Sequence, residues 1–450
     1  MRVTKGLVAG LWAILLAAPA MGQDLKALEQ RLKDQERRIA ELEALQSDQR
    51  LKDAQKEEVI KLINEINADA AKKGGSMPSW LKDLKFKGDF RLRYEGQSTT
   101  SAADAVSPKD RNRARFRLRF GFIKTFLDKE MEVGFRLASG DTSAADGRTI
   151  GSGATSTNQT MTDFFSEKSI WIDLAYAKYT PKSVKGLTII GGKMATPLVH
   201  TDLVWDSDVN PEGFFAQYEA PFFGDVKPFV STGYFLVQES GGGHDTILMT
   251  YQAGVDWAVA KDVGGVIQDL GFTTALAYYD YDHMNSLNTG AVNATRGNMH
   301  RNGSDLLARK FQMINWTTKM KFKALGLKWS PYFDIVHTCG NEDVDPRFDN
   351  QSNGFALGFN LGENKKKGDW SLGYKYARIE SNCTVGAFND SDFGHSNRKG
   401  HVFRGTYNLT DDLTIGASFF WTEPVTTDPS NGLVDDQRTC LVQADLVWKF

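Results

Sequence analysis

The chain contains 450 residues, with 54 Lys and Arg against 56 Asp and Glu, which gives a formal net charge of −2 at pH 7. This near-neutral balance argues against a nucleic-acid-binding protein, and three cysteines are too few for a disulfide scaffold and lack the spacing of a zinc site. Beyond residue 22, no apolar run approaches the roughly 18 to 20 residues of a membrane-spanning helix, so residence in a membrane would require a barrel.

The first 22 residues have the features of a secretory signal peptide. A basic start with Arg2 and Lys5 precedes an apolar run from Leu7 to Ala18, and small residues follow before Gln23. This order predicts cleavage before Gln23 and export of the mature chain.

Residues 23–73 predict an α-helical coiled coil in the periplasm. The stretch from Asp24 to Ala71 is charged and free of Gly and Pro. Its apolar residues follow heptad positions in two blocks, Leu25, Leu28, Leu32, Ile39 and Leu42, then Val59, Leu62, Ile63 and Ile66. A single helix about 70 Å long cannot bury this stripe on itself, so we expect a homo-oligomer, most simply a trimer. A partly disordered spacer is the alternative interpretation.

The segment KKGGSMPS, from Lys72 to Ser79, ends the predicted helix because it contains two glycines and a proline. Residues 74–83 are therefore assigned to a linker and residues 84–450 to an outer-membrane β-barrel.

Strict two-residue alternation begins at Leu84. From Arg113 to Phe122 the sequence reads RARFRLRFGF, with four arginines on one face and apolar residues on the other. The segments from Leu84 to Glu95 and from Glu130 onward also set an apolar face against a charged face. Since successive side chains of a strand point to opposite faces, three such strands in a row favour a lipid-facing side and a wet interior.

The pattern continues to the end of the chain and predicts about sixteen antiparallel strands. The remaining predicted strands are approximately residues 168–179, 187–196, 212–219, 227–238, 248–259, 271–282, 309–323, 327–339, 353–361, 369–380, 400–409, 413–422 and 438–450. Short and long connections alternate, as in outer-membrane barrels, and an even strand number puts both ends of the barrel at the periplasmic side. The chain ends on outward-facing Trp448 and Phe450, which an extracellular β-helix or a soluble sandwich would not explain. The predicted fold class is an all-β transmembrane barrel preceded by an N-terminal α-helical coiled coil.

Several segments resemble the bacterial putative porin family, whose members join a signal peptide, and often a coiled coil, to a barrel. They are FKGDFRLRYE (Phe86 to Glu95), RNRARFRLRFG (Arg111 to Gly121), STNQTMTDFFSEK (Ser156 to Lys168), IDLAYAKYTP (Ile172 to Pro181), GGKMATPL (Gly191 to Leu198) and VWDSDVNPEGF (Val204 to Phe214). The resemblance covers the first third of the predicted barrel. It implies the family's fold and an outer-membrane location, but it identifies no substrate. Phosphate-selective porins combine the same two parts, but their lysine-rich loop is not found here.

A barrel of sixteen strands is wide enough for a water-filled lumen, and its charged inner face predicts the pore lining. The predicted pore-lining residues are Arg91, Arg93, Arg113, Arg115, Arg117, Arg119, Glu130, Glu132 and Arg136. Rows of arginine about 5 Å apart would hold a positive potential that draws anions. In the alternative interpretation the arginines only stiffen the wall by pairing with inward carboxylates, namely Asp89, Glu95, Glu130 and Glu132. Both roles can hold at once.

The longest connection, from Ser139 to Glu167, is the candidate for a constriction loop that folds into the pore. Its candidate polar residues are Asp141, Asp146, Arg148, Asn158, Gln159 and Asp163. Opposite charges facing the arginines across a narrow point would orient polar solutes and impede apolar ones. The alternative is a mobile external loop.

The sequence contains no motif for catalysis, a cofactor or a metal: there is no G-x-S-x-G or H-E-x-x-H segment, and the seven histidines are scattered. Cys339 and Cys383 fall at the outer ends of strands two apart, which suggests a loop disulfide in an oxidising compartment, whereas Cys440 faces lipid. Acidic loop clusters suggest divalent cations that bridge lipopolysaccharide, although such runs are more often simply solvated. These clusters are Asp343, Asp345 and Asp349; Asp390 and Asp392; and Asp435 and Asp436.

The sequence therefore favours a Gram-negative outer-membrane porin for passive diffusion of small hydrophilic solutes, with a weak preference for anions. Its expected partners are outer-membrane lipid, lipopolysaccharide and further copies of the chain in a trimer; no enzyme activity is expected. The alternative is an envelope tether, in which the coiled coil contacts peptidoglycan and the barrel is mainly an anchor.

Overall fold

The computed structural model describes residues 83–101, 109–141, 155–221, 223–284, 296–299, 307, 310–340, 351–427 and 437–450, with the single residues 35 and 61. The chain divides into two compact units, residues 1–82 and 83–450. The predicted signal peptide lies outside the described residues, as do the coiled coil and the linker except for residues 35, 61 and 83. In the described parts of the chain, no helix has the length and apolar character to cross a membrane.

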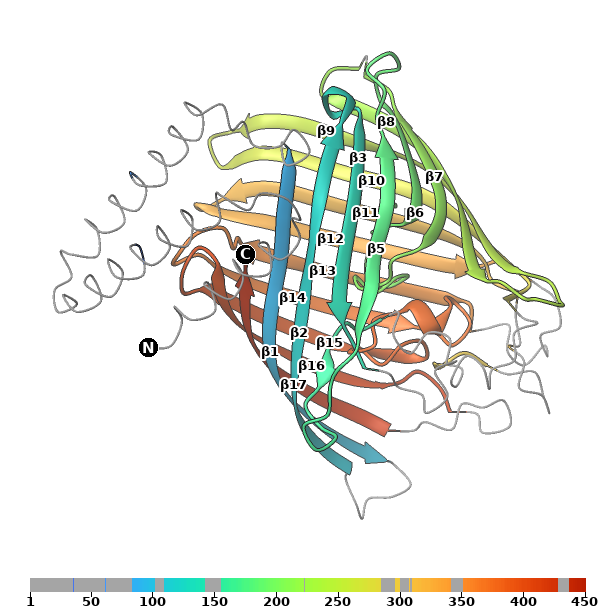
Figure 1. Cartoon of the computed structure of the whole chain (residues 1–450), viewed down its shortest axis with the longest axis vertical. Coiled ribbons are helices and arrows are strands. Elements are labelled where there is room, and N and C mark those ends of the chain that lie inside the picture. Colours follow the sequence, from blue (N-terminus) through green and yellow to red (C-terminus); the bar gives the residue numbers. More distant parts are fainter. Residues whose placement is uncertain are drawn as a thin grey trace, which may run out of the picture. The chain divides into compact units, whose positions relative to one another are not determined.

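Sixteen long strands form a closed antiparallel barrel, which confirms the predicted strand number (Figure 1). They are β1 (Leu84–Ser101), β2 (Lys109–Phe126), β3 (Met131–Ser139), β5 (Ile170–Tyr179), β6 (Leu187–Lys193), β7 (Glu212–Glu219), β8 (Val226–Gln238), β9 (Thr246–Val263), β10 (Ile267–Asp282), β11 (Gln312–Ala324), β12 (Leu327–Thr338), β13 (Asn353–Gly362), β14 (Trp370–Ile379), β15 (Arg398–Asn408), β16 (Leu413–Pro424) and β17 (Gln437–Lys449). Each strand pairs with the next, and β1 also pairs with β17, so the ring closes.

The described parts of the connections contain three short elements. β4 (Gln159–Thr160) pairs with β2 beyond the end of β3. Two 3-10 helices are η1 (Leu127–Lys129), between β2 and β3, and η4 (Gly386–Phe388), between β14 and β15.

Side-chain alternation sets the two faces of the barrel wall. On β1, Leu92 and Tyr94 are 38% and 54% exposed, whereas Arg93 and Glu95 are 7% and 2% exposed. The apolar residues therefore point outward to lipid and the charged residues point inward. The last strand behaves in the same way, with Trp448 and Phe450 exposed on the outer face.

The connections differ at the two ends of the barrel. At one end they are tight turns, such as Leu325 and Gly326 with φ of 54° and 73°, the left-handed values that a two-residue hairpin turn requires. At the other end the connections are long, and several fold inward. Residues 194–211, between β6 and β7, and residues 380–397, between β14 and β15, contain many buried side chains.

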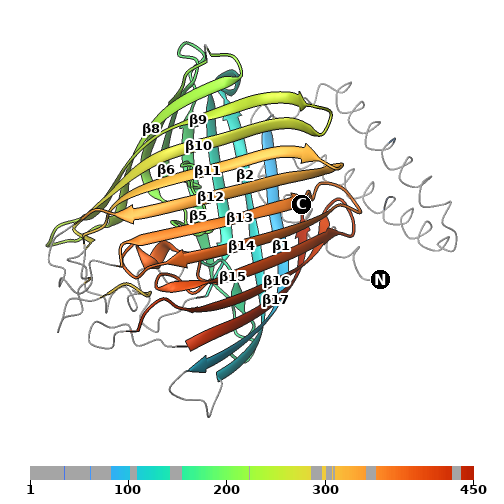
Figure 2. The same ribbon diagram turned by 180° about the vertical axis from the view of Figure 1, so that it is seen from behind.

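The inward loops pack on one wall of the barrel, the inner face of strands β8 to β17. Figure 2 shows these strands from behind. Trp205 lies edge-on to Phe235 of β8 and to Tyr279 of β10, with ring centroids 6.3 and 5.9 Å away. Its indole N–H donates to the Tyr281 hydroxyl at 3.1 Å. The main apolar core therefore lies inside the barrel, between the loops and this wall.

Candidate functional site

The opposite wall carries a dense cluster of arginines, called here the arginine wall. It consists of Arg91 and Arg93 on β1, Arg113, Arg115, Arg117 and Arg119 on β2, and Arg136 on β3. The strand register places Arg91 opposite Arg117 and Arg93 opposite Arg115. Like charges directly opposite each other destabilise a sheet, so this arrangement requires carboxylates between the strands.

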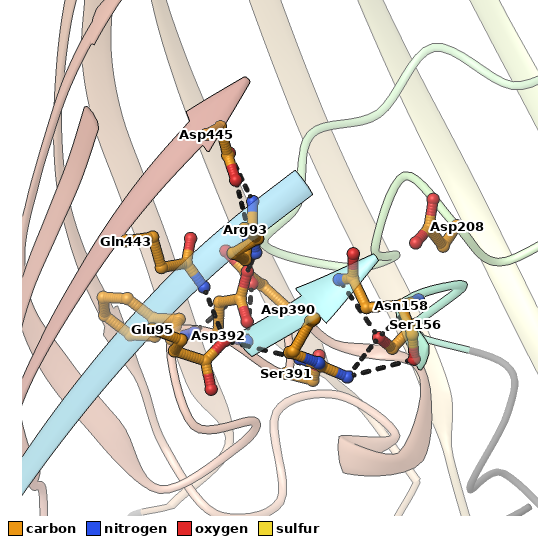
Figure 3. A network of polar contacts seen from close by, with 12 residues as sticks. Arg93, Glu95, Ser156, Asn158, Asp208, Asp390, Ser391, Asp392, Gln443 and Asp445 are labelled. Carbon is orange, nitrogen blue, oxygen red and sulfur yellow. Dashed lines mark hydrogen bonds and ion pairs between the residues drawn. The ribbon is translucent and has the colours of Figure 1, made fainter. Parts of the chain in front are cut away.

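Arg93 makes the best-defined of these ion pairs (Figure 3). Its Nε and Nη2 atoms donate to the two carboxylate oxygens of Asp445, at 2.7 and 2.8 Å, and its Nη1 atom donates to Asp392 at 3.2 Å. The two-pronged contact with Asp445 matches the planar fork of the guanidinium group. It joins β1 to β17 across the closing seam of the barrel.

The carboxylate of Glu95 is almost fully buried and neutralises the charges of two arginines. It pairs with Arg113 and, at 3.3 Å, with Nη1 of Arg115. Gln443 donates to the same carboxylate at 3.2 Å. A buried carboxylate requires such partners, because burial without them is costly.

The remaining arginines of the wall also contact carboxylates, with one exception. Asp89 accepts from Arg117 at 2.7 Å and from Arg119 at 2.8 Å. Asp173 accepts from Nε of Arg136 at 2.5 Å. The exception is Arg91, whose hydrogen-bond partner is the side-chain oxygen of Asn158.

Three loop segments face the arginine wall and are called here the inner loops: residues 155–160, 194–211 and 380–397. Each provides a carboxylate or amide that reaches the wall, as Asp208 does toward Arg119 at 3.5 Å and Asp392 toward Arg93. Figure 3 shows Asp392 beside Arg93 of β1, and Asp208 to one side on a separate loop. Asp141, at the end of β3, contacts Arg115 at 3.7 Å.

The inner loops also bind one another. The backbone N–H of Asp206 donates to the carbonyl of Phe388 at 2.7 Å, and the Ser391 hydroxyl donates to the carbonyl of Thr155 at 3.2 Å. The backbone N–H and hydroxyl of Thr157 both donate to Asp208 at 3.1 Å. All three loops therefore form one connected body.

Asp206 lies at the centre of this body. Its side chain accepts from the backbone N–H groups of Asp208 and Ser391 at 2.9 and 3.3 Å. Burial, followed by the nearby charges of Asp390 and Asp208, raises the pKa of Asp206 to about 9. The group is therefore protonated in the folded protein at neutral pH.

A second ion cluster anchors the inner loops to β14 and β15. Lys375 donates to Asp202 at 2.7 Å and to Asp390 at 3.2 Å, and Arg404 lies within 4 Å of both carboxylates. Lys375 also lies over the Phe393 ring at 4.8 Å. The loops thus have charged as well as apolar contacts with this side of the barrel.

The structure places the seven predicted pore-lining arginines together on the inner face. The two glutamates predicted with them are not part of this cluster: Glu130 accepts from the backbone N–H of Lys182 at 3.1 Å, at the turn end, and Glu132 accepts from the Tyr176 hydroxyl at 2.8 Å. Of the carboxylates proposed to stiffen the wall, Asp89 and Glu95 contact arginines and these two do not.

The candidate constriction residues separate into three groups. Asp141, Asn158 and Gln159 lie together, since Asp141 accepts from the Gln159 amide at 2.5 Å and Asn158 contacts Arg91. Asp163 lies apart, in an exposed turn with Lys168. Asp146 and Arg148 lie outside the described residues.

The contacts of the loop of residues 194–211, with Asp206 and Asp208, and the role of Asp392 were not predicted from the sequence. Val204 to Phe214 resembled a family segment, but no periodic pattern indicated that the loop turns inward. Asp445 and Asp173 lie on predicted strands. Asp445 alternates with the outward-facing Trp448 and Phe450, and this alternation is the signal that indicates its inward direction.

Two hypotheses about the loops are wrong. Cys339 and Cys383 are both free, one exposed and the other buried, so no disulfide joins them. Asp390 and Asp392 are not a surface cation site, because both lie inside the barrel and pair with cationic side chains. Within the described ranges, no group of three or more His, Cys, Asp or Glu side chains is arranged to hold a metal ion. The other acidic clusters lie outside the described residues.

Comparison with solved structures identifies relatives of the fold. The high-pH structure of Pseudomonas putida OprB has a TM-score of 0.50 and 12% identity, and the alignment covers 84% of this chain and 97% of that chain. The low-pH structure of the same protein has a TM-score of 0.42 and 12% identity, with 82% and 93% covered. A mutant of the Rh. blastica porin has a TM-score of 0.41 and 11% identity, with 82% and 100% covered. No curated protein matches the sequence.

Comparison with family models gives a match to the family described as putative porin, over residues 105–320 and 307–435. The matched region includes β2 and β3 of the arginine wall and all three inner loops. It therefore covers more than half of the chain, from β2 to β16, and leaves out β1 and β17. The chain belongs to the putative porin family.

Proposed function

We propose that the protein is an outer-membrane porin, a water-filled channel through which small hydrophilic solutes diffuse passively. The observation that carries this proposal is a strip of ionised side chains on the inner face of β1 to β3, within a closed barrel whose outer face is apolar. So many charged groups on the inner face, several of them only partly buried, are typical of a polar lumen and not of a wholly apolar core. Membership of a porin family points to a channel rather than an enzyme.

We further propose that the path for solutes runs along the arginine wall. The opposite interior wall is occupied by Trp205, Tyr279 and Tyr281 with their neighbours, all buried. A packed apolar region excludes hydrated solutes, so permeation would follow the polar side of the inner loops. Asn158 and Asp208 would then lie at the narrow part of the path.

The ion preference of this channel is expected to be weak. The wall has seven arginines, and all of them except Arg91 pair with carboxylates. These carboxylates are also seven in number: Asp89, Glu95, Asp141, Asp173, Asp208, Asp392 and Asp445. The formal charges therefore cancel in sum, and selectivity depends on which charges remain accessible. We propose a small preference for anions.

Conductance measurement tests the channel directly. The refolded protein in a planar bilayer should give discrete current steps. Under a salt gradient, its reversal potential should have the sign of a channel that prefers anions. Replacing Arg115 and Arg117 with Ser should move that potential toward cations. Folded protein that gives no current steps would contradict the porin proposal, and an unchanged potential would contradict the role of the wall in selectivity.

We also propose that residues 23–73 join three copies of the chain through a periplasmic coiled coil. This rests on the heptad pattern of the sequence. The alternative role for the same segment is a tether that contacts peptidoglycan. Deleting Asp24 to Lys73 distinguishes them: conductance should survive in both cases, whereas attachment of the envelope should fail only if the segment is a tether.

A further inference from the structure

Arg91 differs from the other arginines of the wall because it has no carboxylate partner among the described residues. Its Nη2 atom donates to the side-chain oxygen of Asn158, which is a neutral acceptor. Its Nε atom is enclosed and makes no hydrogen bond. A guanidinium group has five N–H donors, so most of the donors of Arg91 have no partner in the described part of the chain.

The carboxylates closest to Arg91 are already occupied by other donors. Asp89 binds Arg117 and Arg119, and both oxygens of Asp445 bind Arg93. Asp208 accepts two hydrogen bonds from Thr157 and faces Arg119. If one of these carboxylates turned toward Arg91, it would lose an ion pair that it already makes. The existing ion pairs therefore leave Arg91 without a carboxylate partner among the described residues.

The surroundings of Arg91 add further positive potential. Arg117 lies directly opposite on β2, in register with Arg91. The two contacts of Arg117 with Asp89 use its Nε and Nη2 atoms, which leaves Nη1. Asn158 fixes the orientation of the Arg91 fork from the loop side. Arg91 is partly exposed, and Nε is its only nitrogen that is both enclosed and without a hydrogen bond. The two Nη atoms are therefore the donors that an ion in the lumen would meet.

We propose that Arg91, held by Asn158, forms an anion subsite that binds the carboxylate group of small monocarboxylate solutes. One unpaired guanidinium matches one negative charge, and its planar fork matches the two oxygens of a carboxylate. A second negative charge on the solute would face Asp89 and Asp445, which disfavours dianions. The inference rests on the proposed porin function and adds a solute class to it.

Block of chloride current by benzoate tests the subsite, with benzamide as the neutral probe of the same shape. Benzoate should reduce the current of the wild-type protein in a saturable manner, and benzamide should not. Arg91→Gln should raise the half-blocking concentration about ten- to a hundredfold, since hydrogen bonds to charged groups contribute at this level. Arg91→Lys keeps the charge but loses the fork, so it should retain the reversal potential and still weaken the block.

Lys321→Gln is the matched control, because Lys321 lies on the inner face of β11, away from the arginine wall. It removes the same formal charge and should change the half-blocking concentration by less than about twofold, because screening limits its influence. Chloride current from Arg91→Gln in the absence of benzoate verifies that the variant is folded.

Three results would overturn the subsite alone, and a fourth would overturn the porin proposal. Equal block of wild type and Arg91→Gln would overturn the subsite, as would equal effects of Arg91→Gln and Lys321→Gln. Block by benzamide would show that charge does not govern binding and would also overturn it. Absence of chloride current in the wild-type protein would instead overturn the porin function on which the subsite rests.

Discussion

The two sides of the barrel interior use different physical forces. On β1 to β3, arginines and carboxylates form ion pairs, such as Arg93 with Asp445 at 2.7 Å. On β8 to β12, the inner face packs Phe235, Tyr279 and Met313 against the inner loops with almost no exposure. The packed side therefore holds the loops through apolar contacts, whereas the charged side holds them through ion pairs.

The inner loops present polar residues to the arginines because their apolar residues pack on the other wall. Residues 194–211 have Leu203, Val204 and Trp205 buried in the core, and Asp208 three residues later reaches Arg119. One loop therefore contributes apolar side chains to one wall and a carboxylate to the other. Loss of the apolar contacts should release the carboxylate as well.

Trp205→Ala should have the largest effect on stability, because it leaves a cavity in the apolar core of the packed side. Truncation of a buried tryptophan typically costs about 3–5 kcal/mol. We expect a lower free energy of unfolding in a urea titration followed by circular dichroism, and larger, noisier current steps as the loop detaches. Trp421→Ala, on the lipid-facing side at 53% exposure, should leave the step size unchanged. Equal effects of the two substitutions would refute the anchoring role of Trp205.

Glu95→Gln should have the next largest effect, and it acts on the charged side. The change leaves Arg113 without its carboxylate and removes one of the two partners of Arg115. Breaking such a buried ion pair typically costs about 3 kcal/mol, and the reversal potential should move toward anions.

Glu363→Gln is the matched control for Glu95→Gln, because Glu363 lies in a turn and pairs with Lys328 and Lys365. It removes the same charge far from the arginine wall. A reversal potential that moves equally in both variants would show that net charge, and not the wall, determines selectivity.

Asp206→Asn should have the smallest effect on stability, and this effect should depend on pH. The pKa of Asp206 in the folded protein, about 9, exceeds the unfolded value. The group therefore stabilises the fold most below its unfolded pKa near 4, and this contribution is lost as the pH rises toward 9. Local opening of the loops lets the group ionise, which limits the size of the effect. Between pH 5 and pH 8, the free energy of unfolding of Asp206→Asn should therefore rise by roughly 1–2 kcal/mol relative to that of the wild type.

Thermal unfolding of wild type and Asp206→Asn across pH 5 to 9 measures this difference. Asp128→Asn, an exposed carboxylate in the turn after β2, should show no such trend. A constant difference between wild type and Asp206→Asn at every pH would contradict the raised pKa.

The barrel was predictable from the sequence because it depends on a local signal. Alternation of apolar and polar residues, as in the segment from Arg113 to Phe122, identifies both the strand and its inward face. The sixteen strands follow from repetition of that signal. The seven arginines of the wall followed from the same alternation.

The inner loops were not predictable, because their packing depends on contacts between distant segments. Asp208 and Arg119 are 89 positions apart, and no periodicity connects them. One signal was present, however: Phe235, Tyr279 and Met313 are large apolar residues on the inner face of their strands. An inward apolar residue in a barrel indicates that something covers it, and this could have suggested a loop inside.

Thiol modification tests most directly the central claim that the open path runs along the arginine wall. In a background with Cys339, Cys383 and Cys440 replaced by Ser, Arg119→Cys would place a thiol on the wall and Thr317→Cys a thiol on the packed side. A charged methanethiosulfonate reagent should reduce the current of the first variant and leave the second unchanged. Modification of the second alone would contradict the account, because the path would then run through the region described here as packed.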